Sequence, residues 1–292
     1  MTDATEIHKE TLLEKYAANL SSSNNKAHYL SYARDFLERA GDLDRASVER
    51  YLTRLRKNNR RPGTINFAFR VIRRLFVVNG LQWEYHRGEA PAIGERDEHR
   101  PQLSTEIIER MIRAATGGRL QAEEACFLAL STTYGVRREE MYVLGTKDVD
   151  LKNNAIFIST VKHGRQRYHL IPEELKPYLA KHDFSQRYSA TSTSQLFWRI
   201  VNKSKMEGLK SQRLGWHAIR RSVLDGLINN GVNPFAARAF LRWKGTTREL
   251  AMPVRYYGNV VVGLEGTTPV LEEAKGDDEI FEKHPFLPMW RG

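Results

Sequence analysis

The sequence contains a single cysteine, Cys126, within the stretch EEACFLAL. One cysteine excludes a disulfide inside the chain and is typical of a reducing compartment. The apolar neighbours of Cys126 predict a core position, because a reactive thiolate needs an activating neighbour that this stretch does not show.

Long apolar runs and metal-ligand clusters are absent as well. No run approaches the roughly 18 apolar residues of a membrane-spanning helix. The opening residues MTDATEIHKETLLEKY lack the basic-then-apolar layout of a secretory signal. Neither carboxylates nor His and Cys residues gather at metal-site spacing. We therefore expect a cytoplasmic protein with no membrane partner, no metal and no cofactor.

Acidic residues are scarce relative to basic ones. The chain holds 46 Lys and Arg against 35 Asp and Glu, which leaves a formal net charge of +11. Residues 45–75 alone contain ten Lys or Arg and one Glu. This excess favours a polyanionic partner, and nucleic acid before a membrane because no amphipathic basic terminal helix is evident. The alternative is that the basic face is only solvated surface.

Periodicity predicts a mainly helical chain in two domains. Over residues 1–85, apolar positions recur three or four apart in stretches that end at Ser, Asn, Asp or Gly, which predicts consecutive short helices. Residues 86–102 are polar, contain two prolines and lack periodicity, as a linker does. A second domain is expected over residues 103–260, followed by a C-terminal tail over residues 261–292.

The second domain is expected to combine helices with a small sheet. Ser104 or Thr105 can cap a helix over EIIERMIRAATGG, and a largely buried helix ends at Gly135. The stretches AIFISTV and RYHLIP are rich in β-formers and flank the turn KHGRQ, which predicts a hairpin. The expected fold class is therefore mainly α with a small antiparallel β-sheet in the second domain.

Several polar residues of the second domain are unusual for a core. Arg137 directly follows a helix-ending Tyr-Gly, and Lys162 lies in the hairpin turn. His217 and Arg220 lie three positions apart at the front of an apolar helix. Trp243 ends another apolar helix. Each of these residues, taken alone, is better explained as surface or packing.

Taken in order, these residues resemble the tyrosine recombinases, the family of phage-type integrases, Xer and Cre-like enzymes. YGVRREEMYVL is similar to the family's first arginine box, TVKHGRQRYHLIP to its lysine hairpin and HAIRRSVLDGLINNGV to its His-x-x-Arg box. MPVRYYG is similar to the segment with the nucleophilic tyrosine. The helices of residues 1–85 resemble the family's core-binding domain, so the likeness covers roughly residues 10–257.

The resemblance implies a two-domain DNA clamp, with a DNA-binding domain over residues 1–85 and a catalytic domain over residues 103–260. It implies these catalytic residues: Arg137, Lys162, His217, Arg220, Trp243 and Tyr256, with Tyr257 as the alternative nucleophile and Glu140 holding the Arg137 region in place. Candidates for contacts with DNA phosphates are Arg54, Arg56, Lys57, Arg60, Arg61, Arg70 and Arg73.

The chemistry of such an enzyme needs these residue types. Attack on a phosphodiester requires a nucleophile, neutralisation of a phosphorane-like transition state and a proton for the leaving sugar oxygen. Arg137 and Arg220 can fork onto the non-bridging oxygens and stay charged at any working pH. His217 can accept or position the tyrosine proton, and Lys162 can protonate the 5′ oxygen.

Two departures from the family pattern concern the last part of the catalytic domain. The usual LGH reads LRW here, so Arg242 replaces Gly and Trp243 replaces His. Trp occurs at this place in Cre-like members, and its indole N–H can still donate to a phosphate oxygen. The segment before the tyrosines is longer than is common, so alignment favours Tyr256 while Tyr257 stays open.

We therefore expect a site-specific recombinase that cleaves and rejoins double-stranded DNA through a 3′-phosphotyrosyl intermediate, as the integrase or resolvase of a mobile element. Two duplexes need four active sites, which implies a homotetramer on DNA, associated with the nucleoid if the source is prokaryotic. One alternative is a DNA-binding regulator whose catalytic set has decayed. Another keeps the chemistry but relaxes supercoils or resolves hairpin telomeres.

The C-terminal tail has two possible arrangements. Its acidic stretch LEEAKGDDEIFEK can meet a basic neighbour and dock in trans, with four apolar anchors: Phe281, Phe286, Leu287 and Trp290. Alternatively the tail folds back on its own domain or is partly disordered.

Overall fold

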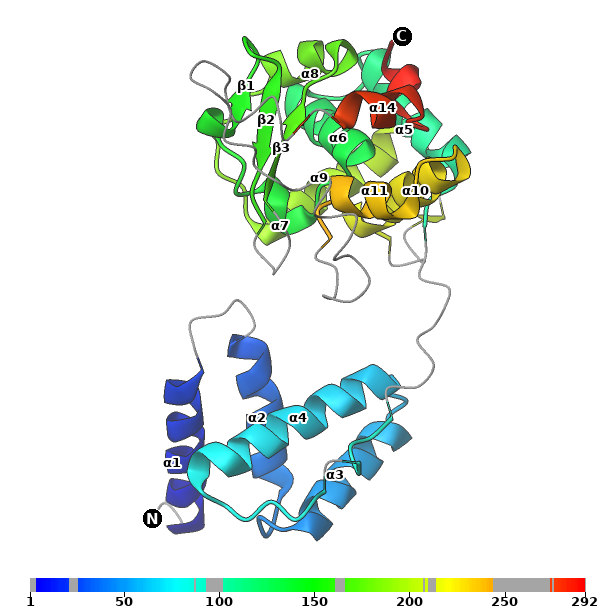
Figure 1. Cartoon of the computed structure of the whole chain (residues 1–292). Coiled ribbons are helices and arrows are strands. Elements are labelled where there is room, and N and C mark those ends of the chain that lie inside the picture. The colour runs from blue at the N-terminus through cyan, green and yellow to red at the C-terminus, as the bar shows by residue number, and fades with distance from the viewer. Residues whose placement is uncertain are drawn as a thin grey trace, which may run out of the picture. The chain divides into compact units, whose positions relative to one another are not determined.

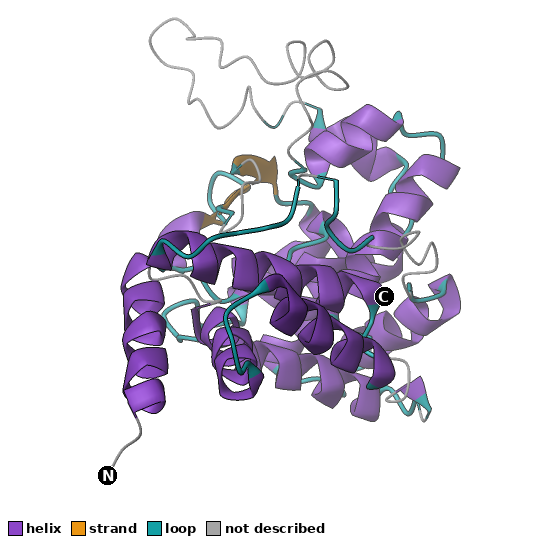
Figure 2. Ribbon diagram, turned by 90° about the horizontal axis from the view of Figure 1, so that it is seen from below, coloured by secondary structure: helices purple, strands orange, loops and turns teal. Residues whose placement is uncertain are grey.

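The computed structural model describes residues 4–20, 26–86, 88–92, 102–160, 166–206, 208–209, 214–243, 274 and 276–291. The chain divides into two compact units, residues 1–99 and 100–292. The boundary falls inside the polar stretch that the sequence marks as a linker. Helices dominate both units and the strands form one small patch (Figure 2). The expected class, mainly α with a small antiparallel sheet, is confirmed.

The first unit is a helical bundle around one apolar core (Figure 1). Its helices are α1 (Ala4–Asn19), α2 (Lys26–Arg39), α3 (Arg45–Lys57) and α4 (Pro62–Asn79). Helix α4 contacts each of the other three. Local signals set the helix ends, because the side chain of Asp44 accepts from the backbone N–H of Ser47 at 2.8 Å and Pro62 opens α4.

The outer face of α4 is basic. Phe69, Ile72 and Phe76 are 3%, 0% and 1% exposed and point into the bundle. Arg70 and Arg73 fall between them in the helical repeat and are exposed. The apolar face of α4 therefore holds the bundle together, while its cations face solvent.

The second unit is built around α6. Its helices are α5 (Thr105–Thr116), α6 (Ala122–Tyr134), α7 (Arg138–Met141), α8 (Lys176–Ala180), α9 (Ala190–Lys203), α10 (Trp216–Asn229), α11 (Pro234–Phe240) and α14 (Asp277–Glu282), with short 3-10 turns η1 (Thr146–Asp148), η2 (Glu173–Leu175) and η4 (Leu287–Arg291). Every residue from 124 to 134 of α6 is buried. Helix α6 contacts α5, α8, α9 and α10, which explains why it is buried on all sides.

The strands form one antiparallel sheet in the order β1 (Val149–Asp150), β2 (Ala155–Ile158) and β3 (Arg167–Leu170). Ile156 pairs with His169 and Ile158 with Arg167, so the predicted hairpin is present. Ile156 and Ile158 are both 0% exposed and join the core of the second unit. The hairpin turn with Lys162 lies outside the described residues.

The described part of the tail packs on its own unit, with α14 and η4 beside the helical core (red in Figure 1). Phe286, Leu287 and Trp290 are 1%, 4% and 3% exposed. A Cβ on Gly226 of α10 would lie 2.5 Å from Cγ of Pro285, so the missing side chain lets the tail approach. These contacts correspond to the alternative in which the tail folds back on its own domain rather than docking in trans.

The single cysteine lies in the core of the second unit. Cys126 is 0% exposed on α6, and burial raises the pKa of its thiol, which is what a core position predicts. Within the described ranges, no helix has both the length and the apolar character to cross a bilayer.

Candidate active site

Three chain segments meet around the N-terminal half of α10. The first is the turn from α6 into α7, residues 135–140. The second is the N-terminal half of α10 itself, and the third follows α11, residues 241–243. Helix α10 contacts both α6 and α11 and lies between these segments. Each of the three segments contributes at least one arginine, so the packing of helices concentrates positive charge.

Arg137 and Glu140 form a pair within a single turn. Arg137 is the N-cap of α7 and Glu140 is its third residue. One carboxylate oxygen of Glu140 accepts from the backbone N–H of Arg137 at 2.8 Å, and the other accepts from its guanidinium at 2.5 Å. Burial alone would raise the pKa of Glu140, but the charge of Arg242 and these contacts with Arg137 lower it to about 2. Glu140 is therefore a buried carboxylate that fixes the direction of the Arg137 side chain.

Arg220 is a buried cation held by carbonyl oxygens. Its side chain is 3% exposed on α10 and donates to the carbonyl of Gly135 at 2.5 Å and to the carbonyl of Leu241. Its guanidinium carbon lies 4.8 Å from the ring centroid of Trp243. Burial, together with the charges of Arg242 and Arg137, lowers the pKa of Arg220 well below its usual value. An anion beside Arg220 would relieve this unfavourable environment.

His217 completes the basic cluster from the start of α10. It is exposed to solvent on one side. Partial desolvation, followed by the charges of Arg220, Arg221 and Arg137, lowers its pKa, while Glu139 opposes the shift. His217 is therefore neutral at neutral pH and has a nitrogen able to accept a proton.

The charges of this cluster do not cancel. The guanidinium groups of Arg137, Arg220 and Arg242 all interact electrostatically with the single carboxylate of Glu140. Within the described residues, this arrangement leaves more positive than negative charge in a largely buried place. Such a site is suited to an anion with more than one negative charge, because fixed donors in a low-dielectric environment stabilise charge without reorganising.

Gly135 allows the arginine cluster to assemble. It ends α6 with φ of 55°, a left-handed conformation that favours glycine. A Cβ at this position would lie 2.6 Å from Cδ2 of Leu241 and 3.2 Å from Cγ of Arg220. A Cβ at Gly135 would therefore require the side chain of Leu241 to shift and would press tightly against Arg220.

Replacing Gly135 by Ala is expected to destabilise the protein by about 1–3 kcal/mol, because overpacking adds to backbone strain. It should also slow cleavage of DNA, since a shift of Leu241, whose carbonyl accepts from Arg220, and the tight contact with Arg220 itself would disturb the position of Arg220. Denaturant unfolding and a cleavage assay measure the two effects. Gly118→Ala is the matched control, because Gly118 has φ of 69° but a Cβ there would meet no atom within 4 Å. Equal effects at both positions would show that the approach to Arg220 is unimportant.

The structure brings together five of the catalytic residues expected from the sequence: Arg137, Glu140, His217, Arg220 and Trp243. Lys162, Tyr256 and Tyr257 lie outside the described residues. Across the described ranges, no group of three or more His, Cys, Asp or Glu side chains is arranged to hold a metal ion.

The basic residues expected to contact DNA all lie in the first unit. Six of them are exposed: Arg56, Lys57, Arg60, Arg61, Arg70 and Arg73. Arg54 differs, because its side chain is 40% exposed and lies 3.8 Å from the carboxylate of Asp35. Arg54 is therefore already partly neutralised within its own unit and is the weakest candidate of the set.

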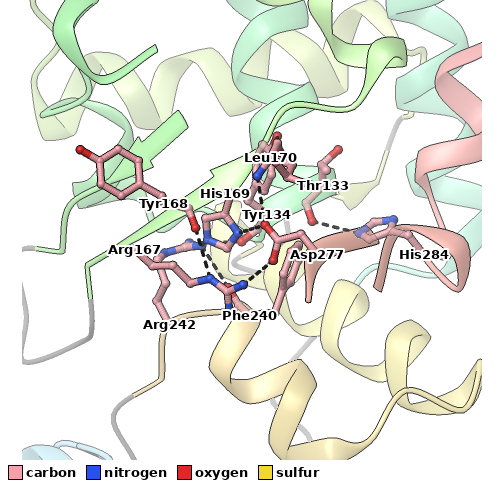
Figure 3. Close-up of polar contacts among 10 residues, drawn as sticks. All are labelled: Thr133, Tyr134, Arg167, Tyr168, His169, Leu170, Phe240, Arg242, Asp277 and His284. Atoms are coloured by element: carbon pink, nitrogen blue, oxygen red, sulfur yellow. Dashed lines mark hydrogen bonds and ion pairs between the residues drawn. The ribbon is translucent and has the colours of Figure 1, made fainter. Parts of the chain in front are cut away.

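Sequence reasoning missed a buried network next to this cluster. In the sequence, Arg242 stands out only as a departure from the family's Gly, and neither His169 nor Asp277 belongs to one of the family's motifs. All three are 0% exposed and are connected by hydrogen bonds (Figure 3). The only local signals are an arginine directly after the apolar run PFAARAFL and a histidine inside a short strand.

Comparisons with known proteins identify the family of this chain. The family model described as the phage integrase family matches residues 101–249. The tyrosine recombinase XerA of Thermococcus kodakarensis is 24% identical over 248 residues, covering 79% of this chain and 86% of that protein. The type 1 fimbriae regulatory protein FimB of Escherichia coli is 28% identical over 145 residues, covering 45% of this chain and 72% of that protein.

Two solved structures share the fold. A lambda integrase dimer bound to a COC′ core site aligns with a TM-score of 0.60 at 14% identity, over 81% of this chain and 95% of that chain. The Tn1549 transposon integrase in complex with a circular intermediate DNA aligns with a TM-score of 0.60 at 16% identity, over 86% and 96%.

The fold and the family match together define a tyrosine-type site-specific DNA recombinase. Because the family model spans half of the sequence, the chain belongs to the phage integrase family. The class of enzyme expected from the sequence is thereby confirmed.

Proposed function

We propose that the chain cleaves and rejoins duplex DNA through a 3′-phosphotyrosyl intermediate, with Tyr256 as the nucleophile and Tyr257 as the alternative. The phenol oxygen attacks the phosphorus, the bond from phosphorus to the 5′ oxygen breaks, and a free 5′ hydroxyl is left. A 5′ hydroxyl from a second strand reverses the step and releases the tyrosine. The number of phosphoester bonds is unchanged, so no external energy source is consumed.

The observation that carries this proposal is the excess of guanidinium groups around Glu140. A phosphodiester carries one negative charge, and attack on it creates a phosphorane-like transition state with two. Arg137 and Arg220 are assigned to its non-bridging oxygens, because their orientation is fixed in advance by Glu140 and by backbone carbonyls. Donors that need no reorganisation stabilise the transition state more than the ground state.

The remaining residues are assigned to proton transfers and to support. His217, neutral for the reasons given above, accepts or positions the proton of the attacking tyrosine. Lys162 donates a proton to the leaving 5′ oxygen. Trp243 supports Arg220 through its ring and offers an indole N–H to a phosphate oxygen.

Double-stranded DNA is the proposed partner of both units. The net charge of +11 provides sequence-independent attraction to phosphates, and the exposed cations of the first unit supply many of the contacts. The lambda and Tn1549 integrases were solved with DNA bound, which supports the same substrate here. We propose that both units bind the same duplex.

Oligomers of this chain are proposed to act on DNA. The lambda integrase structure is a dimer on its core site, which supports self-association. Exchange between two duplexes needs four cleavages, so we propose a tetramer. The likeness to a phage integrase and a transposon integrase favours a role in moving a mobile element.

The test is a suicide substrate, a cognate duplex nicked next to the cleavage position. After cleavage the short fragment with the 5′ hydroxyl diffuses away, so the covalent protein–DNA adduct accumulates. We expect an adduct with the wild type and with Tyr257→Phe, and none with Tyr256→Phe. Denaturing electrophoresis separates the adduct from free protein.

A DNA-binding regulator without catalysis is the second candidate. It is favoured by the replacement of LGH with LRW and by the similarity to a fimbriae regulatory protein. Binding to a verified cognate site without any adduct would support this candidate and contradict the first. Relaxation of a plasmid that lacks the site would instead indicate a topoisomerase-like activity.

A further inference from the structure

Arg242 is the largest fully buried side chain described, and it occupies a position with φ of 58°. Such a conformation is rare for a residue with a Cβ, so compensating contacts must hold it. Its guanidinium donates to the carboxylate of Glu140 at 3.0 Å and to the carbonyl of Tyr134 at 3.1 Å. The other terminal nitrogen faces Nε2 of His169 at 3.0 Å.

The far end of this network is Asp277, the first residue of α14. Its carboxylate accepts from Nη2 of Arg167 at 2.5 Å and from the backbone N–H of Leu170 at 3.1 Å. It also lies 3.0 Å from Nδ1 of His169. Figure 3 shows Asp277 facing the β3 residues and His169 lying between Asp277 and Arg242.

The hydrogen bonds of this network have a single consistent direction. A guanidinium can only donate, so Nε2 of His169 must accept from Arg242, and the ring carries its proton on Nδ1, which faces Asp277. Burial lowers the pKa of His169 to about 4 in spite of Asp277, so the ring is neutral and Nε2 accepts from Arg242. Arg242 in turn donates to Glu140, which holds Arg137.

We propose that Arg242 and Asp277 are positioning residues for Arg137, and that the chain of contacts Asp277–His169–Arg242–Glu140 makes the cleavage step depend on the docking of α14. The inference rests on the proposed function, because it assigns these side chains to the reaction that Arg137 serves. None of the three residues beyond Glu140 contacts the reacting atoms in this assignment. They act through the orientation of the Glu140 carboxylate.

The tail has a second attachment close to the same turn. Nε2 of the buried His284 lies 2.9 Å from the carbonyl of Thr133, and the indole N–H of Trp290 donates to the hydroxyl of Thr132 at 3.1 Å. Both acceptors are on the last turn of α6, just before Gly135 and Arg137. The tail therefore holds the last turn of α6 directly, as well as through the buried charges.

The primary test compares Asp277→Asn with Asp278→Asn. The two substitutions make the same chemical change on neighbouring residues of α14, but Asp278 is exposed whereas Asp277 is 0% exposed. At saturating suicide substrate, Asp277→Asn should slow adduct formation by about tenfold or more, as expected for coupled neighbours, while affinity for DNA stays the same within about twofold. Asp278→Asn should behave as the wild type.

Variants of Arg242 test whether the residues act as one unit. Arg242→Met should slow the adduct step to a similar extent, and the double variant with Asp277→Asn should be no slower than the slower single variant. Arg242→Lys keeps the charge but cannot bridge His169 and Glu140 with a planar fork, so an intermediate rate is expected. Arg242→Lys also serves as the test of the network if Asp277→Asn fails to show a cooperative unfolding transition.

The outcomes separate the inference from the function on which it rests. Folded Asp277→Asn and Arg242→Lys variants that form the adduct at the wild-type rate would overturn the inference alone, leaving α14 as a purely structural element. Additive rate losses in the double variant would also overturn it, since independent effects need no network. A wild type that forms no adduct on its verified site would overturn the proposed function and the inference together.

Discussion

Replacing Arg220 by Ala is expected to slow formation of the covalent adduct by roughly a hundred- to a thousandfold, because loss of one preorganised donor to a developing charge costs about 3–4 kcal/mol. Arg220 has no substitute at its place between the carbonyls of Gly135 and Leu241. Arg220→Lys should also be impaired, since an ammonium group cannot bridge both carbonyls and still offer a fork to phosphate.

The measurement is a single-turnover cleavage rate at saturating suicide substrate, with DNA affinity determined separately by fluorescence anisotropy. Affinity should change little in Arg220→Ala, because many exposed cations hold the DNA backbone. Arg199→Ala is the matched control, as Arg199 is 47% exposed and pairs with Glu123 away from the cluster. Parallel losses of binding and cleavage in Arg220→Ala would contradict its role in the transition state.

The resemblance to the tyrosine recombinases, and not spacing alone, singled out part of this cluster. Arg137 and Glu140 are three residues apart at the start of a helix, a spacing at which the acid can reach back to the N-cap, and they pair in this way. His217 and Arg220 are also three apart on a helix, and they share the same basic cluster. Spacing alone did not show that Arg220 would be buried and His217 exposed, because that depends on α6 and α11.

The missed part of the site depends on contacts between distant segments. His169 is 73 residues from Arg242 and 108 residues from Asp277 in the sequence. No helical or strand period connects positions so far apart, so their pairing follows only from the packing of β3, α11 and α14. For the same reason, the sequence did not decide whether the tail packs on its own domain or docks on a partner. Its apolar anchors fit either its own core or that of a partner.

Secondary structure was predictable where the sequence has strong periodicity or clear stops. Helix α4 runs from Pro62 to Asn79 with Gly80 as its C-cap, as the residues at its ends indicate. The two-residue strand β1 (Val149–Asp150) was not predicted, because it is too short for an alternating pattern and exists only through its pairing with β2.

Glu140 is expected to make the free energy of unfolding depend on pH below about 4.5. Its folded pKa is lowered to about 2 from the usual value of 4.5. A carboxyl whose pKa is lower in the folded than in the unfolded state contributes its full stabilisation at pH values above the unfolded pKa. This stabilisation is lost as the pH falls through the folded pKa. The shift corresponds to roughly 3 kcal/mol. Glu140→Gln removes it and leaves Arg242 without its buried counterion, so we expect a loss of about 3–5 kcal/mol at neutral pH.

Urea unfolding of wild type and Glu140→Gln at about pH 7 and about pH 3 measures this effect, because the difference between the two proteins isolates Glu140 from other acids that titrate. The difference in the free energy of unfolding between the two proteins should be smaller at about pH 3. At that pH Glu140 takes up a proton in the unfolded wild type but remains ionised in the folded wild type. Glu173→Gln is the matched control, since that carboxylate is 78% exposed and pairs only with Lys176 among the described residues, so its effect should stay below about 1 kcal/mol. A small difference in the free energy of unfolding between wild type and Glu140→Gln at neutral pH, or a difference that does not change with pH, would contradict this prediction. It would show that the charge of Glu140 is not needed to stabilise the buried arginines around it.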